Sequence, residues 1–205
     1  MGTNGAGVAF KVNTGKFQLK KVVKDLFGES FEDHNGHFFD IRRPDSVYAV
    51  KTKDLVVLCN SDFAGEFFKN QETSTIKKYL DYFSDPELVF AYEEYDSSES
   101  YSYSLIYNGV VKRQLFSRYR KAVIDFGPPE RTELKWEHAV TYREEEEKGE
   151  EGMLVYIDPE NGYLCSEPFL YQRKLQELMM EKLGFTNWDL GVGDSIIEKG
   201  YFKKT

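Results

Sequence analysis

The dipeptide Asn108-Gly109 constrains the fold of this chain more than any other feature. Two runs rich in β-branched and aromatic residues, 101–106 and 110–116, lie on either side of it. A two-residue hairpin whose twist matches its strands needs positive φ at both turn positions, and Asn followed by Gly adopts that conformation readily. The sequence therefore predicts an antiparallel hairpin here, and with it an antiparallel sheet.

The residues before this hairpin predict alternating strands and helices. A period of two predicts strands at 7–12, 46–51, 54–60 and 88–95, the second and third of which form another hairpin. A helical period predicts one helix over 14–26, ended by Gly28, and a second that begins after Thr73 or Ser74 and ends before Pro86. The resulting order is β-α-β-β-α-β, that of the ferredoxin-like sandwich.

The residues after the hairpin extend this unit. They predict a strand at 121–126, a solvated glutamate-rich loop at 143–152, strands at 153–157 and 163–165, and a last helix that is capped by Ser166 and buries residues between 169 and 183. The tail 186–205 shows little periodicity, and Trp188, Tyr201 and Phe202 are expected to attach it to the body. We therefore predict a single α+β domain over 1–205, with a mostly antiparallel sheet, an added hairpin and a C-terminal helix.

Charge and composition exclude several classes of protein. The chain has 27 Lys and Arg against 35 Asp and Glu, a net charge of −8, which argues against nucleic-acid binding because phosphate contacts require clustered cations. Its 40% hydrophobic content predicts a folded domain, and its apolar runs are too short to predict a membrane span. Cys59 and Cys165 are too few for a disulfide framework, so we expect a reduced, cytoplasmic protein.

No motif predicts a metal or a cofactor. His34 and His37 lie close to Asp33 and Asp40, but a His-x-x-His pair across an Asn-Gly turn lacks the helical register of zinc motifs. The glycines within residues 2–7 precede the first strand instead of following it, so they do not form a phosphate loop. We expect a fold without bound metal or cofactor.

The sequence contains one candidate catalytic site. Asn60, Ser61 and Asp62 follow an apolar strand, and Glu94 lies near the end of strand 88–95. Polar groups at strand ends often line ligand sites, which would suit a small-molecule hydrolase. The alternative interpretation is a loop in which Asn60 and Asp62 bond their own backbone.

Tyrosines are concentrated around the central hairpin. Alternation places Tyr101, Tyr103 and Tyr107 on one face, and Tyr92 joins them if strand 88–95 pairs with 101–107. Tyrosine supplies contact area with little rotamer entropy, so an exposed face of this kind predicts a protein-binding surface. If the C-terminal helix covers the face, the same residues form core instead.

A set of short motifs runs from Ser100 onward. They are the Asn-Gly hairpin, Val111-x-Arg113-x-Leu115, Gly127-Pro128-Pro129-Glu130, Trp136-Glu137 and a closing helix that ends in Leu183-Gly184-Phe185. Together they resemble a family of bacterial proteins of unknown function. The resemblance implies a bacterial cytoplasmic domain and assigns no catalytic residue.

These observations favour a non-catalytic protein-interaction domain of the immunity-protein or accessory type. Its partner would be a protein, because the chain is acidic and rich in aromatic residues but offers no spaced nucleophile, metal set or phosphate loop. The hydrolase with its site at 60–62 and 92–94 is the alternative hypothesis.

Removal of divalent metal tests the absence of a structural metal site. Dialysis against a strong chelator should leave the circular dichroism spectrum and the melting midpoint unchanged, because neither the cysteines nor the His34/His37 pair completes a four-ligand site. A cooperative loss of secondary structure on dialysis would show that the histidine loop binds metal.

Overall fold

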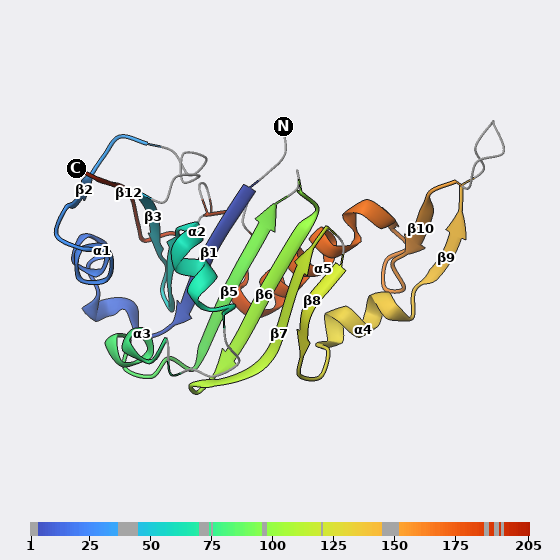
Figure 1. Cartoon of the computed structure of the whole chain (residues 1–205), viewed down its shortest axis with the longest axis horizontal. Coiled ribbons are helices and arrows are strands. Elements are labelled where there is room, and N and C mark those ends of the chain that lie inside the picture. Colours follow the sequence, from blue (N-terminus) through green and yellow to red (C-terminus); the bar gives the residue numbers. More distant parts are fainter. Residues whose placement is uncertain are drawn as a thin grey trace.

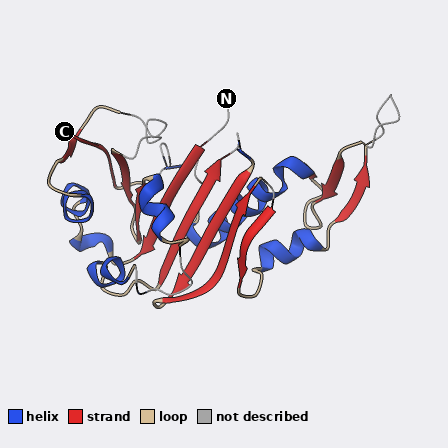
Figure 2. Ribbon diagram, viewed as in Figure 1, coloured by secondary structure: helices blue, strands red, loops and turns tan. Residues whose placement is uncertain are grey.

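The chain folds into two antiparallel sheets and five α-helices within the residues that can be described (Figures 1 and 2). The computed structural model describes residues 4–36, 45–69, 74, 76–95, 98–119, 121–144, 152–186, 189–190, 193 and 195–205. The predicted α+β class, the large antiparallel sheet and the C-terminal helix are confirmed.

The larger sheet has nine strands among the described residues, in the order β2-β12-β3-β4-β1-β5-β6-β7-β8. In chain order these are β1 (Asn4–Lys11), β2 (Phe31–Asp33), β3 (Ser46–Lys51), β4 (Leu55–Cys59), β5 (Leu88–Tyr95), β6 (Ser100–Tyr107), β7 (Val110–Arg118), β8 (Lys121–Phe126) and β12 (Glu198–Lys204). The first predicted hairpin is β3 with β4, which pair antiparallel.

The central hairpin has the predicted conformation. Tyr107 pairs with Val110, and the two residues between them have positive φ, 47° at Asn108 and 75° at Gly109. This turn twists in the same sense as β6 and β7, so the two strands stay paired along their length.

Helices cover both faces of the larger sheet. Three short helices pack on one face: α1 (Leu19–Phe27), α2 (Ser61–Glu66) and α3 (Lys77–Tyr82). The long helix α5 (Leu170–Leu183) packs on the other face, where its Leu175, Leu178 and Met179 are buried. Figure 1 shows α5 behind the sheet and α2 in front of it. The strands in the middle of the sheet are therefore buried on both sides.

The predicted tyrosine surface lies in the core. Tyr92, Tyr101 and Tyr103 are buried, and Tyr107 is half-buried against the same cluster as α5. The reason is the position of α5, whose apolar side chains cover the face on which Tyr92 and Tyr103 lie. The four tyrosines therefore do not form the exposed face that the strand alternation led us to expect.

The C-terminal segment contributes a strand to the sheet and is more than a packed tail. β12 lies between β2 and β3 and pairs antiparallel with both. Tyr201 and Phe202 are buried on opposite faces of the sheet, as neighbouring residues of a strand must be. Trp188, which we expected to anchor the tail, lies outside the described residues.

A second, smaller sheet is formed by strands that lie between β8 and β12 in the sequence. Helix α4 (Arg131–Glu137), which the sequence did not predict, leads from β8 to β9 (Val140–Arg143), β10 (Leu154–Ile157) and β11 (Leu164–Ser166). These three strands form a sheet of order β11-β10-β9, which we call the arm. Figure 1 shows β9 and β10 beyond α4, away from the larger sheet. Of the glutamate-rich loop, residues 145–151 lie outside the described part of the chain.

Substitution at Gly109 tests the hairpin. Gly109→Val should lower the free energy of unfolding by about 1 kcal/mol or more, because a β-branched residue is strained at a φ of 75°. Asn108→Gly is the matched control and should cost much less, since glycine adopts positive φ freely. Chemical denaturation of both variants measures the difference. Equal stability of Gly109→Val and the wild type would contradict the turn assignment.

Candidate binding surface on the arm

Asn60, Ser61 and Asp62 begin helix α2. The Asn60 side chain accepts a hydrogen bond from the Phe63 backbone N–H at 2.8 Å and donates one to the Ser46 carbonyl oxygen at 2.9 Å. It is the N-cap of α2, and Asp62 lies in the first turn, where a negative charge is favourable. Asn60 therefore has the backbone-bonding role of the alternative interpretation.

Glu94 lies on the other face of the larger sheet. It is buried, and its Oε1 accepts hydrogen bonds from the Gln172 and Gln176 side chains of α5 at 2.7 and 3.3 Å. Helix α2 packs on the opposite face. The structure therefore does not bring Glu94 together with Asn60, Ser61 and Asp62, so these four residues do not form one site.

Glu93 is the carboxylate of this strand that faces α2. Burial raises its pKa, and Arg118, whose Nη2 lies 3.7 Å from Glu93 Oε2, offsets this only in part. A general acid must contact its substrate, and the Glu93 side chain is enclosed by the sheet and the end of α2. It is not in contact with any of the described hollows on the surface.

The two cysteines are buried, and the described histidine of this loop packs on a tyrosine. Both thiols are buried, and burial raises the pKa of Cys59 to about 12, so it is not ionised near neutral pH. His34 packs edge-on against Tyr201, while His37 and Asp40 lie outside the described residues. Within the described part of the chain, no three His, Cys, Asp or Glu side chains are grouped to hold a metal ion.

A buried ion pair joins the larger sheet to α4. Arg113 of β7 donates from Nε and Nη2 to the two carboxylate oxygens of Glu133, at 2.9 and 2.6 Å. Its Nη1 donates to Asp125 and to the carbonyl oxygens of Phe126 and Gly127. This bidentate pair holds the first helix after the sheet against the sheet's last strands.

The surroundings of this pair favour its charged form. Burial alone would raise the pKa of Glu133, but hydrogen bonds from Arg113 and Tyr103 and from the Glu130 backbone lower it below its ordinary value. Tyr103 Oη accepts a hydrogen bond from Arg113 Nε at 3.3 Å, so a tyrosine predicted to bind a partner supports the ion pair instead.

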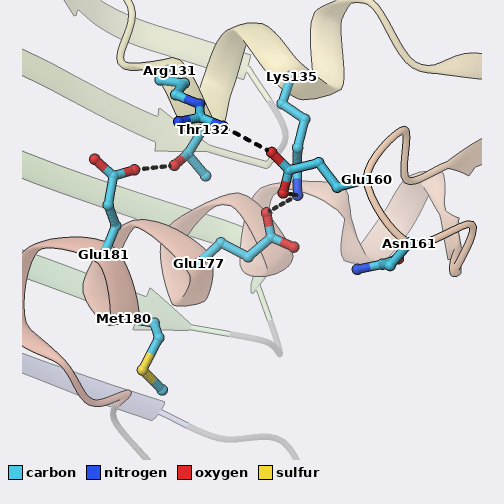
Figure 3. A pocket seen from close by; sticks show the side chains of 8 residues that line it. All are labelled: Arg131, Thr132, Lys135, Glu160, Asn161, Glu177, Met180 and Glu181. Atoms are coloured by element: carbon cyan, nitrogen blue, oxygen red, sulfur yellow. Dashed lines mark hydrogen bonds and ion pairs between the residues drawn. The ribbon is translucent and has the colours of Figure 1, made fainter.

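A polar hollow of about 480 Å³ lies where α4 meets α5 (Figure 3). Its lining consists of Arg131, Thr132, Lys135, Glu160, Asn161, Glu177, Met180 and Glu181. Lys135 Nζ lies 2.8 Å from Glu177 Oε2, and it also lies 3.1 Å from the buried Asp158. Thr132 Oγ1 donates to Glu181 at 2.6 Å.

The charges of this hollow compensate one another. Glu160 pairs with Arg131 at 3.3 Å, and Glu177 also accepts a hydrogen bond from the Trp136 indole at 2.9 Å. The arrangement therefore fastens α4 to α5 at the base of the arm.

The arm presents apolar side chains to solvent. Val140 and Leu164 lie on either side of Ile157 in one row across the three strands, on one face of the arm. They are 69% and 62% exposed. Tyr142 and Met153 are also exposed and lie on the same face by strand alternation. The opposite face is covered at β10 and β11, where Tyr156 and Cys165 pack against Trp136 and Leu170.

A second hollow, of about 500 Å³, lies between the arm and α5. Its lining comprises Trp136, Tyr163, Leu164, Cys165, Ser166, Phe169, Gln172, Arg173 and Gln176. Leu164 belongs both to this hollow and to the apolar row, so the two surfaces meet at β11.

The sequence contains one feature that predicts helix α4, which precedes this surface, and the strand analysis did not use it. Glu130 and Glu133 form a capping box at the start of α4, with the Glu130 backbone N–H donating to Glu133 at 2.7 Å. That spacing predicts a helix after Pro129, and hence a new element before Val140.

Comparisons of the chain with protein-family models, curated proteins and solved structures found no match. Among the described helices, none is both long enough and apolar enough to cross a membrane. The function must therefore be inferred from the residues of this chain alone.

The buried ion pair can be tested by removing one charge. Glu133→Gln should lower the free energy of unfolding at pH 7 by about 3 kcal/mol, because Arg113 loses its bidentate partner. Glu137→Gln, an exposed change on the same helix, is the control.

The loss of stability in Glu133→Gln should depend on pH. The pKa of Glu133 is lowered in the folded state, so its contribution is present above the ordinary value of 4.5 and is lost as the pH falls through the folded pKa. The stability difference between wild type and Glu133→Gln should shrink below pH 4.5. A difference that is constant across this range would contradict the role of the charge.

Proposed function

We propose that this protein is a non-catalytic protein-interaction domain that binds its partner through the arm. The proposal rests on the apolar row of Val140, Ile157 and Leu164, in which the two end residues are exposed and Ile157 is half-buried. Such side chains lose contact with water only when another surface covers them, and apolar residues gathered on one exposed face are typical of interaction sites.

The chemistry of the described residues supports binding over catalysis. The thiols are buried, and three of the four buried carboxylates among the described residues are held by specific donors: Glu133 by Arg113, Glu94 by two glutamines and Asp158 by Lys135. Groups fixed in this way stabilise the fold, and none of the three is free to contact a substrate.

The charge of the chain indicates the chemistry of the partner. Between the ends of β9 and β10 the sequence contains six glutamates and one lysine, within a chain of net charge −8. Opposite charges across an interface accelerate association and disfavour wrong partners. We infer a partner that is basic where it approaches this connector.

The source, the compartment and the type of this protein can be proposed as well. The motifs between Ser100 and Glu137 resemble bacterial proteins, and both cysteines are free thiols, which suits a reducing compartment. We therefore propose a bacterial cytoplasmic domain of the immunity-protein or accessory type, with neither nucleic acid nor membrane as its ligand.

We also propose that the first half of the chain is a ferredoxin-like unit. Strands β5, β1, β4 and β3 are consecutive neighbours in the larger sheet, and all their pairings are antiparallel. Helices α1 and α3 pack on the same face, as the two crossovers of a split βαβ unit do.

Partner capture with matched variants tests the proposed function. The double variant Val140→Ser, Leu164→Ser removes both ends of the exposed row. The control Val123→Ser, Ile197→Ser removes two apolar side chains of similar exposure, 63% and 64%, outside the arm. The tagged full chain should capture a defined protein from its own cell, and the arm variant should retain at most about one tenth of it.

The control variant should capture as much partner as the wild type. Equal melting midpoints of the two variants would show that the loss is not caused by unfolding. Identical capture by the arm variant and the control would contradict the proposal.

A further inference from the structure

A hollow of about 260 Å³ lies where the ends of α1 and β12 meet β2, α2 and α3. Its residues are far apart in the sequence, from Leu26 to Lys204, and only the fold brings them together. Strands β2 and β12 stand at one end of the larger sheet, whereas β8, from which the chain continues into the arm, stands at the other end. The hollow is therefore separate from the surface proposed above for a protein partner.

Apolar side chains form a large part of this lining: Leu26, Phe27, Phe31 and Phe63. The Phe27 ring centroid lies 5.7 Å from that of Phe31 and 5.1 Å from that of Phe63. Phe31 and Phe63 are buried and Phe27 is half-buried, so packing holds the three rings in place. An apolar group of a ligand would meet a preformed surface here.

Two carboxylates of α2 also line the hollow. Asp62 and Glu66 are one helical turn apart, so they lie on the same face of α2. Glu66 Oε2 accepts a hydrogen bond from the Tyr79 hydroxyl at 2.8 Å, and the Lys78 ammonium lies over the Tyr79 ring at 4.5 Å, close enough to interact with Glu66. Asp62 is exposed and has no ion pair within the described part of the chain. Asp62 is therefore the carboxylate that is left for a ligand's ammonium group.

The lining contains one cation, the ammonium group of Lys204. Lys204 pairs with Phe31 in the ladder between β12 and β2, which places it beside the phenylalanine rings. Although Lys204 and Asp62 line the same hollow, no ion pair joins them, and Lys204 has none with any other described residue. The hollow thus offers one positive and one negative group, held apart from each other and both next to apolar side chains.

We propose that this hollow binds a free α-amino acid with an apolar side chain. The ammonium group of the ligand pairs with Asp62 and its carboxylate pairs with Lys204, while its side chain packs on the phenylalanine rings. A ligand with a single charge would leave the opposite charge of the protein without a partner. The volume of about 260 Å³ suits so small a ligand, since sites for drug-sized molecules enclose roughly 300–1,000 Å³.

Titration of the full chain with L-phenylalanine, followed by proton–nitrogen correlation NMR, tests the proposal. The amide signals of residues 26–31, 60–66 and 204 should shift until they saturate, whereas the signals of the arm strands should not move. The absence of saturable shifts with phenylalanine, leucine and methionine alike would overturn the proposal.

Two analogues of phenylalanine separate the roles of the charges. Phenethylamine lacks the carboxylate, and hydrocinnamate lacks the ammonium group. Each should bind at least about tenfold more weakly than phenylalanine, because each loses one charged hydrogen bond. If either analogue bound as tightly as phenylalanine, the ligand would not be recognised as a zwitterion and the proposal would be wrong.

Two variants assign each charge of the ligand to its residue. Lys204→Gln should weaken phenylalanine binding at least about fivefold and leave phenethylamine binding unchanged. Asp62→Asn should weaken the binding of both these probes and leave hydrocinnamate binding unchanged. A folded variant that weakened all three probes equally would overturn the contact assigned to that residue, because a lost contact affects only the probes that make it.

Matched controls exclude a general effect of charge. Lys203→Gln changes the neighbouring lysine, whose side chain points to the other face of the sheet by strand alternation, and Asp85→Asn changes an exposed aspartate outside the hollow. Both should bind phenylalanine as the wild type does. The arm variant Val140→Ser, Leu164→Ser should also bind phenylalanine normally, so a failure of this inference and a failure of the proposed function are independent results. A loss of phenylalanine binding in the arm variant would contradict the separation of the two sites.

Discussion

The arm of this protein depends on a buried ion pair between Arg113 and Glu133. Arg113 belongs to β7, whereas Glu133 belongs to the helix that follows the last strand of the hairpin region, so the pair fixes where the chain goes when it leaves the larger sheet. Separating the two would leave a charge buried without its partner, which is strongly unfavourable. Helix α4, and with it the start of β9, is held in place for this reason.

Helix α5 contacts two different layers, the larger sheet on one side and α4 on the other. On the sheet side, α5 buries Leu175, Leu178 and Met179 against the strands that carry Tyr92 and Tyr103. On the other side, its carboxylates accept hydrogen bonds from Thr132 and Trp136 of α4. α5 is thus covered by apolar contacts toward the sheet and by ionic contacts toward α4. The arm extends past this junction, and Val140 and Leu164 at the two sides of its outer face stay exposed.

Some elements of this fold are specified by their own residues and others by distant segments. Asn108 and Gly109 predicted their turn, because its conformation is a property of the two residues themselves. Strand β12 was missed, because Glu198, Lys199 and Lys203 give it no apolar periodicity, and it is a strand only through its pairing with β2 and β3. β9 was missed for a similar reason: its four residues are all exposed, so no buried face marks them. The predicted tyrosine binding surface was wrong, because the exposure of a tyrosine depends on which segments cover it.

The sequence by itself determined the elements whose cause is local: the central hairpin, the β3–β4 hairpin, the α5 helix ended by Gly184 with φ 77°, and the acidic character of the chain. Only the tertiary structure decided which side of each strand is covered. Tyr92 and Tyr103 became core because α5 packs on them, whereas Val140 and Leu164 stayed exposed because α4 carries their strands beyond the sheet. Whether a residue is buried depends on distant segments of the chain. A periodic pattern shows only that a strand or helix has an apolar face, not which segment covers that face.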